Sequence, residues 1–201
     1  GAVLTNKVAL NQFPHTITAS IMFAGAVMVA VAAYHLKRNQ HVSSMYPSLR
    51  FGLWTALIGG AGTVLSGDGL GLAMVQTQPM KMAAAEALYD TTESAPFSIL
   101  TVGTLDGSRS VFQIDIPTML SFLATGDFGA TVKGVNDLEA EYDQTYGPGE
   151  YTPNIPLAYW SFRLMIGFGF LGTLFVLLAM WGMRKGGTPR GRWFAPAMYS
   201  L

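Results

Sequence analysis

The sequence predicts an all-α integral membrane protein, with three transmembrane helices of a helix bundle and a long extracytoplasmic loop between the second and the third. Two observations lead to this fold class. Half of the 201 residues are hydrophobic and only 12% are charged, which is about half the charged fraction of ordinary soluble domains. In addition, three long segments are almost free of charged side chains, and a helix needs about 20 such residues to cross a bilayer.

Residues 1–66 are expected to hold the first two transmembrane helices. Residues 15–36 contain no charged side chain and form a run too long for the apolar core of a signal peptide, so we expect a helix that stays in the membrane. The second span, about residues 49–67, is rich in glycine and only just long enough. The third, residues 157–183, is the longest apolar run and carries one charge, Arg163, near its beginning.

Charged residues are segregated along the chain, and this predicts the topology. All 12 acidic residues lie between Asp68 and Glu150, whereas the turn 37–50 and the tail 184–201 contain basic residues and no acidic ones. Short basic segments of membrane proteins are usually cytoplasmic. We therefore predict that the turn and the tail are cytoplasmic and that residues 67–156 lie outside the membrane.

The external segment is too long for a plain connector, and its composition predicts partial order. The stretch "FSILTVG" favours an extended strand, and residues 116–125 favour a short amphipathic helix with Pro117 in its first turn. Residues 134–153 are polar and rich in turn-forming residues, so we expect them to be the loose part of the loop.

The stretch "QTQPMKMAAAEALYD" places Lys81 and Glu86 among methionines and alanines just beyond the second span. Pro79 is suited to the first turn of a short helix that would carry both. Five residues apart, they would lie roughly 140° apart around such a helix, so we expect each to address a ligand or a separate partner. The alternative is an interfacial helix whose lysine and glutamate are simply solvated.

Polar groups at membrane depth are the other candidates for chemistry. His15 lies near the outer end of the first span, and Arg163 and Met165 lie in the outer third of the third span. Imidazole and thioether form a known axial pair for a haem iron, and helix bundles often hold such cofactors. The alternatives are an interfacial histidine, a methionine that fills the core and an arginine that extends to lipid headgroups.

Four segments in the same order, "FPHTITAS", "SGDGLGLAMVQTQPMKMAAAEALYD", "FQIDIPTMLSFLAT" and "PLAYWSFRLMIGFGF", resemble subunit I of the bacterial cytochrome bd quinol oxidases. The resemblance runs through nearly all of the chain. It implies a fragment that corresponds to the fifth, sixth and seventh transmembrane helices of the family, with a quinol-binding loop of the short type. The first four helices and the C-terminal helices of such a subunit are absent from this sequence.

The resemblance also implies roles for five residues. His15 and Met165 correspond to the axial ligands of the low-spin haem b, and Arg163 to the arginine beside that haem. Lys81 and Glu86 correspond to the lysine and glutamate implicated in quinol oxidation, so we expect Lys81 to position the quinol and Glu86 to take its proton.

For the whole protein, the resemblance implies a quinol oxidase of the bacterial cytoplasmic membrane, an enzyme of which this fragment alone is not active. The complete subunit would carry a second haem b and haem d. Its partners would be the rest of subunit I, subunit II, membrane lipid, quinol, and small accessory subunits where the complex has them, with no nucleic acid. Two alternatives remain open: a membrane haem b electron-transfer subunit that oxidises no quinol, and a structural or transport subunit.

Overall fold

A computed structural model describes residues 5–104 and 109–184 of the chain. The chain divides into two compact units. The first consists of the described parts of residues 1–67 and 167–201, and the second consists of the described parts of residues 68–166.

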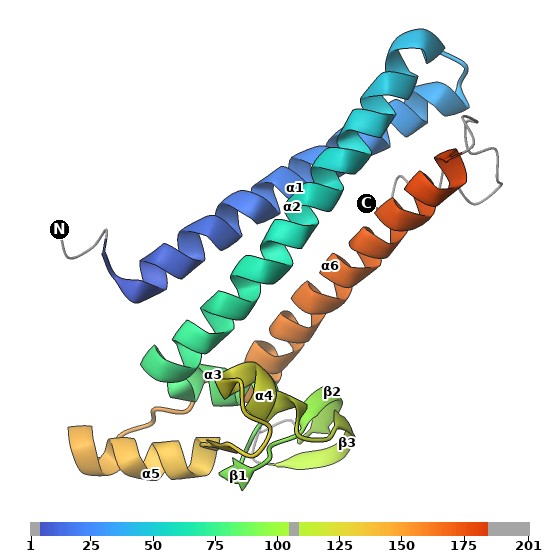
Figure 1. Cartoon of the computed structure of the whole chain (residues 1–201). Coiled ribbons are helices and arrows are strands. Elements are labelled where there is room, and N and C mark those ends of the chain that lie inside the picture. The colour runs from blue at the N-terminus through green and yellow to red at the C-terminus, as the bar shows by residue number, and fades with distance from the viewer. Residues whose placement is uncertain (1–4, 105–108, 185–201) are drawn as a thin grey trace. The chain divides into compact units, whose positions relative to one another are not determined.

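Three helices are long and apolar enough to cross a membrane: α1 (Lys7–Lys37), α2 (Val42–Thr77) and α6 (Ile155–Met183). Helices α1 and α2 run side by side in opposite directions and are joined by a short turn, as Figure 1 shows. The described residues thus confirm the predicted all-α membrane fold. Of the predicted tail 184–201, all residues but Arg184 lie outside the described part of the chain.

The helix boundaries differ from the predicted spans for local reasons. Helix α1 begins before residue 15 because the side chain of Asn6 caps it and accepts hydrogen bonds from the backbone N–H groups of Val8 and Ala9. Helix α2 begins at Val42 and continues to Thr77, beyond the predicted residues 49–67 at both ends. It stops there because the next residue precedes a proline, and a residue before proline avoids the helical conformation.

Close backbone contact between α1 and α2 organises the first unit. A Cβ atom added to Gly59 would lie 2.3 Å from the backbone nitrogen of Met22, and one added to Gly25 would lie 2.4 Å from that of Ala56. Small residues at such crossings let membrane helices pack tightly in the absence of a hydrophobic driving force. The core of this unit continues into the second half of α6, with these buried residues at its centre: Val29, Ala32, Leu49, Leu53, Val176 and Ala179.

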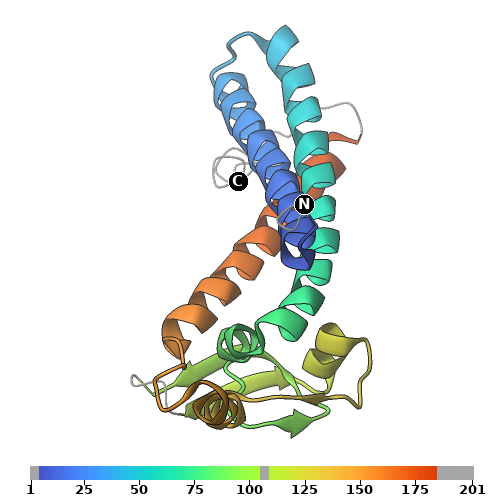
Figure 2. The ribbon, with the colours of Figure 1, turned by 90° about the vertical axis from the view of Figure 1, so that its left-hand side faces the viewer.

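The second unit holds the segment between α2 and α6, together with the adjoining ends of those helices. Strands β2 and β3 form an antiparallel hairpin, and β1 pairs with β4; Figure 2 shows the hairpin together with the short helices of this unit. The elements in chain order are α3 (Pro79–Glu86), β1 (Thr92–Glu93), β2 (Phe97–Gly103), β3 (Ser110–Ile116), α4 (Met119–Thr125), β4 (Thr131–Val132) and α5 (Val135–Tyr146).

Two predictions for this unit need correction, although the strand over "FSILTVG" is confirmed as β2. Helix α4 begins at Met119, so Pro117 precedes it instead of lying in its first turn. Residues 134–153, expected to be loose, contain the 12-residue helix α5. This helix is ordered by packing, because its Val135 and Leu138 are buried in a cluster with residues of α3 and the start of α6.

Candidate functional site

Helix α3 carries both of the candidate quinol-site residues. Pro79 occupies its first turn, as predicted, and Glu86 is its last residue. The next residue, Ala87, adopts a left-handed conformation with φ of 51° and closes the helix with hydrogen bonds to Ala83 and Ala84. The carboxylate is therefore presented at a tightly terminated helix end.

Glu86 forms a buried ion pair with Arg163, which lies in the first third of α6. The Nη2 atom of Arg163 lies 2.5 Å from Oε2 of Glu86, and its Nη1 atom lies 3.5 Å from Oε1. The side chains are only 8% exposed for Arg163 and 2% for Glu86. Burial raises the pKa of the Glu86 carboxyl above its usual value, while the hydrogen bond and the charge of Arg163 act in the opposite direction.

Aromatic rings surround the guanidinium group of Arg163. Its Cζ atom lies 4.4 Å from the ring centre of Phe97, 4.8 Å from that of Tyr159 and 5.5 Å from that of Phe162. Rings at these distances attract a cation and exclude water from it. The Nε atom of Arg163 is also buried and has no hydrogen-bond partner among the described residues, so it can donate to an acceptor outside them.

Lys81 is exposed on α3, whereas Glu86 is buried. The separation of the two around the helix agrees with their spacing in the sequence, and Glu86 has the separate partner that this spacing favours. The alternative of a merely solvated glutamate is wrong. The guanidinium of Arg163 holds Glu86, a partner that the sequence did not predict for it.

His15 is half-buried within the first unit, and its ring is oriented by α2. Its Nδ1 atom lies 3.1 Å from the carbonyl oxygen of Thr63 and 3.4 Å from the hydroxyl of Ser66. A Cβ atom added to Gly67 would lie 3.2 Å from the Cε1 atom of the ring. Histidine ligands of metals usually donate one ring N–H to such a carbonyl and bind the metal through the other nitrogen. The contacts of His15 therefore fit a haem ligand.

Met165 belongs to the second unit and is 53% exposed on α6. Its thioether is not buried by the packing of this unit, so it is available to bind a haem iron. The unpartnered Nε–H of Arg163, two residues earlier, suits an acidic group such as a haem propionate. The chemical types of these three side chains thus fit a haem.

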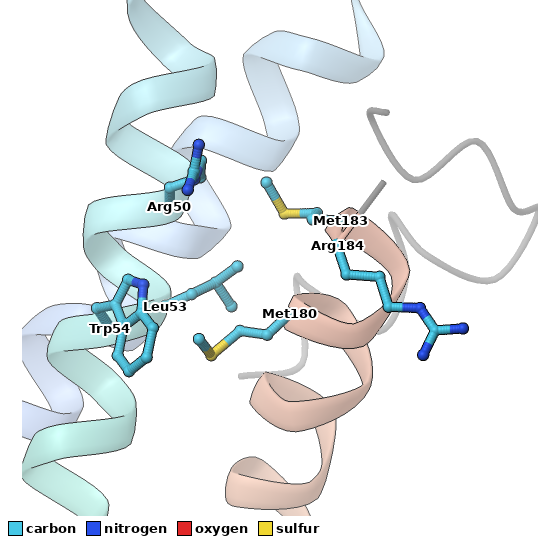
Figure 3. Close-up of a pocket in the computed structure, with 6 residues that line it drawn as sticks. All are labelled: Arg50, Leu53, Trp54, Met180, Met183 and Arg184. Atoms are coloured by element: carbon cyan, nitrogen blue, oxygen red, sulfur yellow. The ribbon is translucent and has the colours of Figure 1, made fainter. Parts of the chain in front are cut away.

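The first unit contains a pocket of its own. It has a volume of about 310 Å³ and lies between α2 and the end of α6 (Figure 3). Its lining consists of Arg50, Leu53, Trp54, Met180, Met183 and Arg184. None of the five predicted site residues contributes to it.

Tyr159 and Phe97, whose rings lie against Arg163, were not predicted from the sequence. The spacing of Tyr159 and Arg163 contained a signal, because residues four apart on a helix lie on the same face. Phe97 could not be found in this way, since it comes from a strand far away in the sequence.

The chain is similar to known proteins along its whole length. A family model described as cytochrome bd terminal oxidase subunit I matches residues 1–201. The chain is 32% identical over 202 residues to cytochrome bd ubiquinol oxidase subunit 1 of Bacillus subtilis (strain 168), covering 100% of this chain and 43% of that protein. It is 25% identical over 254 residues to cytochrome bd-II ubiquinol oxidase subunit 1 of Escherichia coli (strain K12), covering 98% of this chain and 49% of that protein.

The fold resembles the structure of the bd oxidase from Geobacillus thermodenitrificans. The TM-score is 0.80 at 25% sequence identity, with 99% of this chain and 43% of that chain covered. The sequence thus spans less than half the length of the relatives and of the solved structure that it matches.

Proposed function

Because the chain belongs to the cytochrome bd terminal oxidase subunit I family, we propose that it forms the quinol-oxidising face and one haem site of a respiratory quinol oxidase. The observation that carries this proposal is the buried pair of Glu86 and Arg163 at the end of α3. The complete subunit would carry a second haem b and haem d, which would supply the chemistry of oxygen reduction outside this segment. The remainder of subunit I and subunit II are the partners that complete the enzyme.

The distribution of charge supports an outer location for quinol oxidation. The acidic residues all lie in 68–150, and the turn between α1 and α2 is flanked by Lys37, Arg38 and Arg50. By the positive-inside bias, residues 67–156 face the outside of the bacterial cytoplasmic membrane. Protons released from quinol on that side then add to the transmembrane gradient.

Oxidation of a quinol to a quinone releases two electrons and two protons, so the site needs a proton acceptor close to a hydroxyl of the ring. Glu86 has this role. An effective general base has a pKa close to the working pH, and burial raises the pKa of this carboxyl toward that range. Arg163 favours the charged form of the carboxylate, because its hydrogen bond and its charge lower the pKa of Glu86. Exposed Lys81 positions the quinol at the surface of α3 by donating to one of its oxygens.

His15 and Met165 would hold the low-spin haem b of this segment through an imidazole nitrogen and a thioether sulfur. When bound, the haem supplies a one-electron acceptor for quinol oxidation. The Thr63 carbonyl orients the imidazole of His15 through Nδ1 and leaves Nε2 for the iron. Arg163 donates from its Nη atoms to Glu86, and its buried Nε–H would be left to hold an acidic group of the haem.

The test is quinol oxidation by the complete oxidase that carries Glu86→Gln. The variant should oxidise quinol at least about 100-fold more slowly, whereas an artificial electron donor that bypasses quinol should still reduce the haems. Lys81→Ala should chiefly raise KM for quinol. Glu93→Gln is the matched control, because this glutamate is exposed in the same segment, and it should oxidise quinol at the parental rate.

Two results would contradict the proposal. If Glu86→Gln oxidises quinol at the parental rate with intact haem spectra, the carboxylate is not the proton acceptor. If the parental complex binds haem b but no quinol reduces it, the segment is an electron-transfer anchor without quinol oxidation of its own.

A further inference from the structure

Tyr159 connects the β2–β3 hairpin to the ion pair. It is 2% exposed, and its hydroxyl accepts a hydrogen bond from the backbone N–H of Thr101 at 2.6 Å and lies 3.0 Å from the hydroxyl of Ser98. Both partners belong to β2 and are themselves buried. The ring of the same tyrosine lies against the guanidinium group of Arg163.

An irregularity of β2 makes this connection possible. In a regular strand, residues three apart point to opposite faces of the sheet. Here the register shifts between Ser98 and Leu100, and the hydroxyls of Ser98 and Thr101 lie 2.5 Å apart. Such bulges redirect side chains and are common beside functional sites. The bulge brings both hydroxyls to the side of the strand where the phenol of Tyr159 lies.

The hairpin contacts Arg163 at a second point. Phe97, the first residue of β2, lies with its ring centre 4.4 Å from the Cζ atom of Arg163. The strand therefore contributes one ring directly and holds a second ring, that of Tyr159, by hydrogen bonds to its hydroxyl.

We propose that Tyr159 is a positioning residue of the quinol-oxidising site, which anchors the hairpin to α6 and so holds Arg163 on the carboxylate of Glu86. The phenol does not touch the quinol; it acts through the arginine. The seating of the hairpin thereby sets how firmly Glu86 is paired. This inference rests on the proposed function of Glu86 as the proton acceptor, and it adds the hairpin to the machinery that controls that acceptor.

The charged surroundings of Glu86 make Arg163 the decisive group. Lys81 of the same helix is exposed. Helix α5 packs against α3, but its carboxylates have other hydrogen-bond partners. Asp137 accepts from Thr91, Glu139 from Tyr151 and Thr152, Glu141 from Lys133, and Asp143 from Gly149. Among the described residues, Arg163 is the cation that contacts the Glu86 carboxylate. Loosening its hold raises the pKa of Glu86 further, because the arginine lowers that pKa.

The experiment uses Tyr159→Phe in the complete oxidase, because this variant keeps the ring and removes the hydroxyl. Tyr151→Phe is the matched control, because it also removes a tyrosine hydroxyl from the same unit, one that donates to the carbonyl of Gly147 instead of bonding the hairpin. Two quantities are measured against pH. One is the infrared carbonyl band of protonated Glu86, assigned by its loss in Glu86→Gln, and the other is kcat/KM for quinol.

In Tyr159→Phe, we expect the midpoint of the infrared titration and the acidic limb of kcat/KM to move to higher pH by about half a unit to one unit. Both should stay in place in Tyr151→Phe. If Tyr159→Phe does not assemble, Ser98→Ala serves instead, because it removes one partner of the phenol and should move both quantities in the same direction.

The outcomes separate the two ideas. If the infrared midpoint moves and the kinetic limb does not, Tyr159 positions Arg163 but Glu86 is not the proton acceptor, so the proposed function fails. If neither moves, or if Tyr151→Phe moves them equally, the positioning role is overturned. A purely structural role would lower stability or yield and leave both titrations in place.

Discussion

The ion pair of Glu86 and Arg163 predicts a large and unequal response to the removal of its partners. For charge centres about 4 Å apart, the Coulomb attraction is about 4 kcal/mol at an effective dielectric constant near 20. Much of it offsets the desolvation of two groups whose side chains are 8% and 2% exposed. Arg163→Met removes the attraction but leaves the buried carboxylate, so we expect it to cost about 3 kcal/mol of unfolding free energy.

Two further variants complete the comparison. The double variant Glu86→Gln with Arg163→Met leaves no buried charge, so most of the loss should be recovered. Lys133→Met is the matched control, because Lys133 and Glu141 also lie 2.5 Å apart but are 56% and 51% exposed. Breaking that exposed pair should cost less than about 1 kcal/mol.

The dependence of the loss on pH identifies the buried carboxylate as its cause. In Arg163→Met, the folded-state pKa of Glu86 lies above its unfolded value of about 4.3, since burial raises it and the arginine no longer lowers it. The folded state then binds the proton more tightly than the unfolded state. The unfolding free energy should therefore fall by up to about 1.4 kcal/mol per pH unit between the two pKa values as the pH rises.

The assay is the thermal transition of the complete oxidase in detergent, followed by tryptophan fluorescence at several pH values. A loss of 3 kcal/mol lowers the transition of a domain of about 200 residues by roughly 6 °C or more. The haem spectrum is recorded in parallel, so that loss of cofactor is recognised. Equal transition temperatures for Arg163→Met and the double variant, independent of pH, would refute the reasoning.

Three other predictions test the haem, the topology and the helix packing. Met165→Leu should alter the low-spin haem spectrum while the fold is kept, because the two side chains have similar volumes; an unchanged spectrum excludes this ligand. In a cysteine-free complete subunit, an impermeant reagent added outside intact cells should label a cysteine replacing exposed Gln144 and not one replacing exposed Ser43, and the reverse pattern contradicts the topology. Gly59→Ala should destabilise by about 1–3 kcal/mol, since the new Cβ would lie 2.3 Å from the backbone of α1. Gly71→Ala, with nothing within 4 Å of its Cβ, should stabilise slightly, and equal transition temperatures for the two would disprove the close contact.

Local rules were sufficient for the helices that cross the membrane and for the start of α3. The spans follow from hydropathy, which depends on consecutive residues, because every backbone group in the bilayer must be satisfied within its own helix. The start of α3 at Pro79 follows from the fixed φ of proline and its missing N–H. The five candidate residues could also be named from the sequence, through their residue types at membrane depth and the family resemblance, although their roles remain predictions.

Those local rules do not predict contacts between residues that are far apart in the sequence. Helix α5 arises in a polar, turn-rich stretch because Val135 and Leu138 find a buried cluster, which no property of residues 134–153 alone reveals. The partner of Glu86 is 77 residues away, on the third span, where the sequence predicted Arg163 as a neighbour of a haem and not of Glu86. Hydropathy and turn preferences depend on neighbours within a few residues, whereas an ion pair depends on where the chain returns. The sequence by itself thus determined which groups are available, and the tertiary structure decided that Glu86 is buried against Arg163.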